Sequence, residues 1–168
     1  MGVLLGLIIL AGTILRLIQA DESLGGDEIS TLWVVQNNGL VDTIRVVSGD
    51  AEITPPLNFI LSWFAVRLGS APELVRLPAL LSGIAVIPVV FLLGRKVIGE
   101  PAGLAGAAVM ALSPFMIFFS GNGRAYTLMV LLLAASTFAM VKADETGRRG
   151  WWVAYALLSC AAMYSHYT

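Results

Sequence analysis

Cysteine and charged residues are both scarce in this chain. The one cysteine, Cys160, lies inside an apolar run, so an intramolecular disulfide is excluded and the usual zinc-binding spacings are absent. Charged residues make up 12% of the 168 residues, whereas 58% are hydrophobic, and the mean hydropathy is +0.85. These values lie outside the usual balance of a soluble domain and predict that most of the chain sits in lipid.

Acidic and basic residues are nearly equal in number, and neither dominates the chain. The net charge is -1, the acidic residues concentrate before residue 74, and basic pairs recur later between apolar runs. This alternation along the chain indicates how the chain is oriented in a membrane. We therefore expect membrane lipids, and no nucleic acid, among its partners.

The N-terminus lacks the basic segment that opens a secretory signal peptide. Its apolar stretch covers residues 2–19, and the one arginine there, Arg16, comes late in that stretch. This order favours a retained first span over a cleaved signal. At the other end the chain stops directly after an apolar run, so we expect residues 1–168 to be the N-terminal, catalytic module of a longer protein.

Five apolar runs approach the roughly 20 residues that a transmembrane helix needs. They are residues 2–19, 77–94, 102–119, 125–141 and 151–168. A sixth run, residues 55–66, is too short to span a membrane and is predicted to be a helix at the membrane interface. Its Trp63 fits that position, because tryptophan is enriched at the interface. The prediction is an all-α fold: a polytopic transmembrane helical bundle of about five spans, with juxtamembrane helices in a first outer loop, residues 20–73.

The positions of Lys and Arg set the direction of these spans, because basic residues collect on the cytoplasmic side. With the N-terminus inside, a count of five spans places the connections after the second and fourth spans on the cytoplasmic side. These connections carry Arg95, Lys96, Lys142, Arg148 and Arg149. The acidic first loop, the loop 121–124 and His166 then face outward. Counting residues 55–66 as a full span would invert this arrangement.

Small residues and prolines within the spans predict close helix packing. Gly103 and Ala107 form a small-xxx-small pair, and Pro88 and Pro114 can kink their helices.

Asp27 and Glu28 are the first candidates for chemistry. Asp27 follows two glycines and precedes an amphipathic stretch, so it is either the N-cap of a helix or a general base for an acceptor hydroxyl. Adjacent helical residues point about 100° apart, so the two carboxylates cannot both meet one substrate atom. One of them would act and the other would support it.

Arg124 is the second candidate, in the segment 121–126 at the outer mouth of two spans. It either snorkels to the interface or binds an anion, since nearby glycines admit a ligand and a guanidinium matches phosphate oxygens. His166, at the outer end of the last run, either lines the same cavity or anchors its helix at the interface.

The order of these segments resembles the GT-C glycosyltransferases that use polyprenyl-phosphate sugars, a group that includes protein O-mannosyltransferases and aminoarabinose transferases. The resemblance covers essentially the whole chain. Its carriers are Asp27-Glu28, Thr54-Pro55-Pro56-Leu57, Arg76-Leu77-Pro78, Arg124-Ala125-Tyr126 and Tyr164-Ser165-His166-Tyr167.

This resemblance implies that Asp27 is the catalytic carboxylate, with Glu28 beside it. It implies that Arg124 binds the donor phosphate, with Tyr126 and His166 nearby. Many relatives have a histidine or lysine just before the Pro-Leu segment, where this chain has Thr54 and Pro55.

The expected reaction moves a sugar from a polyprenyl-phosphate donor to a hydroxyl of a lipid, glycan or protein acceptor, with inversion. We expect no cofactor and no metal site; if a divalent cation takes part, Asp27 and Glu28 are its oxygen ligands. The GT-C enzymes that the sequence resembles suggest a multi-pass protein of a bacterial plasma membrane with an extracytoplasmic site. The alternative location is the endoplasmic reticulum. The alternative is a transporter or scaffold subunit, although transporters usually carry ionisable residues near the bilayer midplane.

Overall fold

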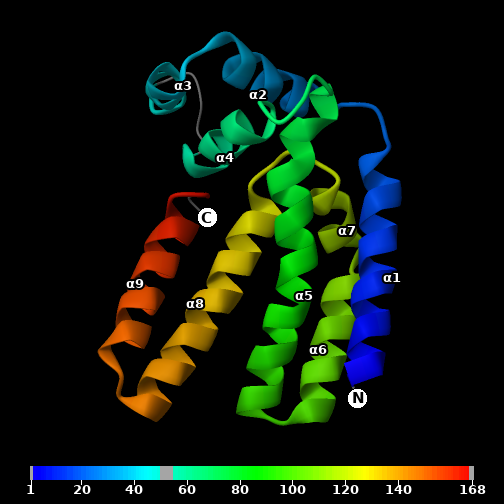
Figure 1. The fold of residues 1–168 in the computed structure, drawn as a ribbon, viewed down its shortest axis with the longest axis vertical. Coiled ribbons are helices and arrows are strands. Elements are labelled where there is room, and N and C mark those ends of the chain that lie inside the picture. Colours follow the sequence, from blue (N-terminus) through cyan, green and yellow to red (C-terminus); the bar gives the residue numbers. More distant parts are fainter. Residues whose placement is uncertain (1, 50–54, 167–168) are drawn as a thin grey trace.

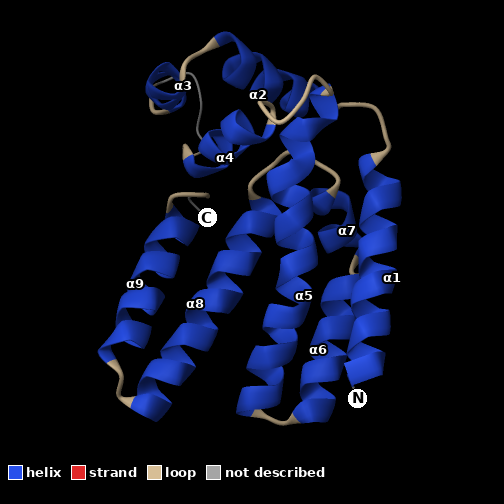
Figure 2. Ribbon diagram, viewed as in Figure 1, coloured by secondary structure: helices blue, strands red, loops and turns tan. Residues whose placement is uncertain are grey.

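The computed structural model describes residues 2–49 and 55–166, and within these ranges the chain is helical and has no strand (Figure 2). Five helices run along the long axis of the molecule: α1 (Gly2–Ala20), α5 (Leu77–Val97), α6 (Glu100–Leu112), α8 (Tyr126–Thr146) and α9 (Arg149–Met163). Three shorter helices lie across one end: α2 (Gly26–Asn37), α3 (Leu40–Val47) and α4 (Leu57–Ala65) (Figure 1). The all-α fold class is confirmed, and so is the short helix in residues 55–66.

By length and hydropathy alone, fewer than five of the described helices qualify as complete membrane spans. Three described segments are long and apolar enough to cross a membrane: Gly2–Ala20, Pro72–Val97 and Tyr126–Thr146. A fourth is present if α6 and α7 (Pro114–Ser120) count as one broken span. The last predicted span corresponds to α9, whose 15 residues rise only about 22 Å at 1.5 Å each.

The segment 102–119 is not one straight span, because it bends by 55° between α6 and α7. Ser113 and Pro114 stand at the bend, and Pro114 is the first residue of α7. Proline has no N–H for the helical ladder, so the helix breaks here, and the Ser113 hydroxyl accepts a hydrogen bond from the Met116 N–H. The predicted kink at Pro114 is thus a full break, whereas α5 continues through Pro88.

Close packing of α5 on α6 forms the centre of the bundle. Both small residues of the predicted pair, Gly103 and Ala107, are buried. A Cβ on Gly103 would lie 2.6 Å from the Phe91 carbonyl oxygen, so only glycine allows this approach. The core around it consists of Val86, Ile87, Phe91, Ala107, Ala111 and Met116.

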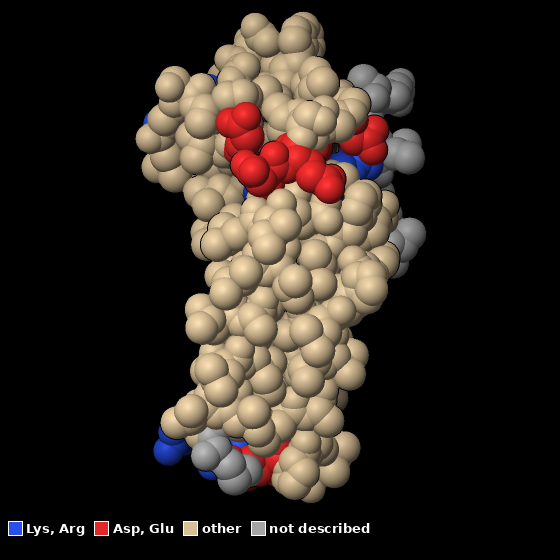
Figure 3. Space-filling model, turned by 90° about the vertical axis from the view of Figure 1, so that its right-hand side faces the viewer, with Lys and Arg blue, Asp and Glu red and all other residues tan. Residues whose placement is uncertain are grey.

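The two ends of the bundle carry the polar groups. The N-terminus and the α5–α6 and α8–α9 connections lie at one end, and the layer of α2–α4, the α7–α8 loop and the end of α9 lie at the other (Figure 1). On the face drawn in Figure 3, a broad surface without Asp, Glu, Lys or Arg separates a charged band near the α2–α4 layer from the charges at the opposite end. This is the surface of a protein that sits in a bilayer.

Candidate active site

A buried ion pair joins the α2–α4 layer to the bundle. Glu28 is in the first turn of α2, and Arg76 ends the 3₁₀ helix η1 (Pro72–Arg76), directly before α5. Arg76 Nε lies 2.6 Å from Glu28 Oε1, and Arg76 Nη2 lies 2.7 Å from Glu28 Oε2. Both side chains are almost fully buried, at 4% and 3% exposure. This bidentate geometry gives a strong and directional charge pair.

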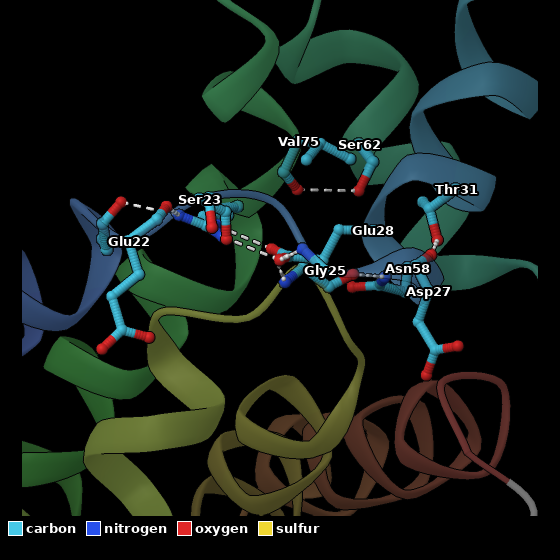
Figure 4. A network of polar contacts seen from close by, with 12 residues as sticks. Glu22, Ser23, Gly25, Asp27, Glu28, Thr31, Asn58, Ser62 and Val75 are labelled. Carbon is cyan, nitrogen blue, oxygen red and sulfur yellow. Dashed lines mark hydrogen bonds and ion pairs between the residues drawn. The ribbon is translucent and has the colours of Figure 1, made fainter.

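Arg76 also holds the connection between α1 and α2. Its Nη1 donates to the carbonyl oxygens of Ala20 (2.8 Å) and Glu22 (2.6 Å), and its Nη2 donates to that of Ser23 (3.0 Å) (Figure 4). An arginine has five N–H groups, and all five are therefore used within the protein. Arg76 has no donor left for a ligand phosphate.

Glu28 is equally saturated. Its Oε2 also accepts the Gly25 N–H (2.8 Å), and its Oε1 accepts the Gly123 N–H (2.9 Å). Burial alone would raise the pKa of the Glu28 carboxyl, but the hydrogen bonds from Arg76, Gly25 and Gly123 outweigh it, and the pKa lies below the ordinary glutamate value. Glu28 is therefore ionised at neutral pH.

The interpretation of Asp27 as a helix N-cap is wrong. Helix α2 begins at Gly26, Gly25 is the N-cap, and the carboxylate that binds the N-cap N–H is that of Glu28. A glutamate at the third helical position has the reach for this contact, so the capping role belongs to Glu28. The Asp27 side chain points away from the ion pair instead (Figure 4).

The loop between α7 and α8 is attached to this network. The Gly123 N–H donates to Glu28, and the Gly123 carbonyl oxygen accepts the Asn58 Nδ2 amide at 3.1 Å. Both polar atoms of Gly123 are thus held by the α2–α4 layer, one residue before Arg124.

Asp27 and Arg124 meet at the surface beside this network. Asp27 Oδ2 lies 3.8 Å from Arg124 Nη1, with the Asp27 side chain 75% exposed and that of Arg124 23% exposed. The structure therefore brings together the carboxylate and the guanidinium that the sequence analysis singled out separately.

Aromatic rings continue from Arg124 along the start of α8. The Tyr126 ring lies 4.9 Å from the His166 ring and 4.3 Å from the Phe119 ring, measured between centroids. The Leu57 N–H donates to the Tyr164 carbonyl oxygen, which fixes the end of α9 against α4. Tyr126 and His166 are therefore neighbours, and a shared cavity with Arg124 stays a prediction.

Sequence reasoning overlooked Arg76 and Asn58 as site residues. In the sequence, Arg76 served only as part of the Arg76-Leu77-Pro78 segment on which the family resemblance rests. A lone arginine at the start of an apolar run indicates that a buried acidic or carbonyl partner is needed. Asn58 gives no such signal. Thr54 and Tyr167 lie outside the described residues.

Oxygen ligands for a cation are few here. Among the described residues, no three His, Cys, Asp or Glu side chains come together as a metal site. Of the adjacent carboxylates, Glu28 is saturated and points away from Asp27, which leaves Asp27 as a single ligand.

These features describe a membrane-embedded helical protein with a polar site at the α2–α4 end of its bundle. The chain matches the family model described as dolichyl-phosphate-mannose-protein mannosyltransferase over residues 54–168, a range that includes Arg76, Arg124, Tyr126 and His166 but neither Asp27 nor Glu28. No curated protein and no solved structure matches the chain. The chain belongs to this family and is a membrane glycosyltransferase of the GT-C type. In general terms, membership implies a polyprenyl-phosphate sugar donor and a glycan or protein acceptor.

Proposed function

We propose that this protein transfers a sugar from a polyprenyl-phosphate donor to an acceptor hydroxyl at the outer membrane face, with Asp27 as general base. The observation that carries the proposal is the different state of the two adjacent carboxylates. Glu28 has no accepting position left, whereas the Asp27 carboxylate is exposed beside Arg124. Of the two, only Asp27 is free to take a proton.

Arg124 binds the donor phosphate in this proposal. Of Arg76 and Arg124, only Arg124 has N–H groups that a ligand can reach, because all five N–H groups of Arg76 donate within the protein. The 3.8 Å separation from Asp27 is too long for a strong hydrogen bond, so a phosphate can displace the carboxylate from the guanidinium. Tyr126 and His166 line the site next to Arg124.

The reaction is a single displacement. The acceptor hydroxyl gives its proton to Asp27 as its oxygen bonds to the anomeric carbon of the sugar. The bond from that carbon to the phosphate oxygen breaks, and the electron pair leaves with the lipid phosphate, which Arg124 stabilises. Attack opposite to the leaving group inverts the anomeric centre. No step needs a metal, and a carboxylate pair is not available to bind one.

Orientation follows from the separation of charges. The site and the acidic layer share one end of the bundle, and the α5–α6 and α8–α9 connections, with Arg95, Lys96, Lys142, Arg148 and Arg149, share the other. Under the positive-inside rule this arrangement supports a site that faces outward. We propose a multi-pass enzyme of the plasma membrane; its assignment to a bacterium rests only on the kind of proteins that the sequence resembles.

The test compares Asp27→Asn with Asp42→Asn in membranes that contain the full chain at matched expression. Asp42 is an exposed acid of the same layer, in α3, so its loss controls for surface charge. Removing a general base typically costs 10²- to 10⁴-fold in rate. We expect that loss of sugar transfer for Asp27→Asn, with donor binding retained, and full transfer for Asp42→Asn. Full transfer by Asp27→Asn would refute its role, and wild-type membranes without transfer would refute the proposed polyprenyl-phosphate donor.

A further inference from the structure

Arg16 is a buried arginine that the proposed reaction does not use. Helix α1 continues past it to Ala20, and its side chain has 0% exposure. Four hydrogen bonds hold it: Nε to Ser120 Oγ (3.1 Å), Nη1 to the carbonyls of Gly12 (2.9 Å) and Ala111 (3.1 Å), and Nη2 to that of Met110 (2.8 Å). A charged side chain inside a membrane helix is costly, so its retention calls for a reason.

The break between α6 and α7 explains why these carbonyls are available. In a continuous helix the Met110 carbonyl would accept the N–H of residue 114, but Pro114 has none. The Ala111 carbonyl loses its partner at the same 55° bend. In lipid, such orphaned carbonyls must be satisfied by the protein itself. Arg16 supplies the missing donors to both.

Arg16 also fixes the end of α7 from which the Arg124 loop starts. Ser120, the last residue of α7, is fully buried against it. Gly83 of α5 closes the other side, since a Cβ there would lie 1.9 Å from Ser120 Oγ and 3.2 Å from Arg16 Nε. The next residue, Gly121, packs so closely on Gln19 that a Cβ would lie 3.0 Å from its backbone.

The loop that presents Arg124 is therefore anchored at both ends by buried charged groups. Arg16 holds Ser120 at its start, and Glu28 holds Gly123 near its finish. We propose that Arg16 is a positioning residue for donor binding: it satisfies the carbonyls at the α6–α7 break and so sets the place of the Arg124 guanidinium. This inference rests on the proposed function, and Arg16 itself does not touch the donor.

The kinetic test measures sugar transfer by the full chain in membranes for wild type, Arg16→Met, Arg16→Lys and Ser120→Ala. A misplaced binding group can cost up to about 100-fold. We expect the donor KM to rise about 10- to 100-fold in Arg16→Met and less in Arg16→Lys and Ser120→Ala, with the acceptor KM unchanged. A role in folding alone would lower the maximal rate and leave both KM values unchanged, and that result would overturn the inference.

A second readout does not depend on transfer. In a Cys160→Ser background, Asn122→Cys is labelled with a membrane-impermeant maleimide, and Asp42→Cys in α3 serves as the control. We expect Arg16→Lys to raise the labelling rate of residue 122 several-fold and to leave that of residue 42 unchanged. Equal rates with and without Arg16 would overturn the inference even if transfer proceeds. If wild type does not transfer sugar, the proposed function fails, and labelling alone decides whether Arg16 holds the loop.

Discussion

Glu28→Gln is the substitution whose effect the structure specifies most sharply. The two carboxylate oxygens of Glu28 face four donors: Arg76 Nε and Nη2, and the N–H groups of Gly25 and Gly123. Glutamine has almost the same shape, but one of its two terminal groups is an NH₂ donor. Either orientation of the amide therefore sets a donor against two donors and leaves the Arg76 charge buried without its counter-ion.

The magnitude follows from this geometry. Removing one partner of a buried ion pair costs about 3 to 5 kcal/mol. For a chain of this size, each 1 kcal/mol shifts the midpoint of thermal unfolding by about 2 to 4 °C, so we expect Tm to fall by about 6 to 20 °C.

The assay is thermal unfolding of the purified full chain in detergent, followed by tryptophan fluorescence. Asp42→Asn is the matched control, because Asp42 pairs with Arg45 at 3.5 Å on an exposed helix face, where an ion pair contributes little. We expect the control to unfold at the wild-type temperature. A Glu28→Gln protein that unfolds at the same temperature as the control would show that the Glu28–Arg76 pair does not hold the α2–α4 layer on the bundle.

Further predictions concern the same end of the bundle. The pKa of Glu28 is lowered in the folded protein, so its stabilising contribution is complete above the ordinary glutamate pKa of about 4.3. That contribution is lost as pH falls through the lower, folded-state pKa. Measurements of Tm at decreasing pH should show this loss in wild type and not in Glu28→Gln. Gly83→Ala should lower Tm by several degrees because its Cβ would overlap Ser120 Oγ, whereas Gly150→Ala, with nothing within 4 Å, should not, and equal Tm values would contradict the packing. Arg124→Gln should raise the donor KM at least about tenfold, as expected for the loss of a charge-assisted bond to phosphate, and an unchanged donor KM would remove Arg124 from the site.

Local sequence signals predicted most of the helices and the exposed residues of the site, Asp27 and Arg124. Runs of apolar residues marked the long helices, and Pro114 marked the break, because hydropathy and the missing proline N–H act within a few residues. Asp27 stood out as an acidic residue after two glycines in the first outer loop, and Arg124 as an arginine beside a glycine between two apolar runs. Their roles in catalysis stay predictions.

Local sequence signals did not predict which of the two acidic residues caps helix α2. Asp27 and Glu28 are both acceptable near a helix start, and the choice between them depends on Arg76, 48 residues away, and on Gly123, 95 residues away. Those partners draw the Glu28 carboxylate inward, where it also reaches Gly25, and leave Asp27 outside.

Composition and apolar runs were enough to identify an all-helical membrane protein, because long apolar segments in lipid satisfy their backbone polar groups within helices. The sequence also determined which ends of the bundle carry acidic and basic residues. Which charges are buried depends on how the helices pack in space. Arg16 and Arg76 look like ordinary span-end arginines in the sequence, and their roles appear once distant carbonyls and a distant carboxylate surround them. The physical reason is that burying a charge is favourable only when its partners are already in place, and those partners come from other helices.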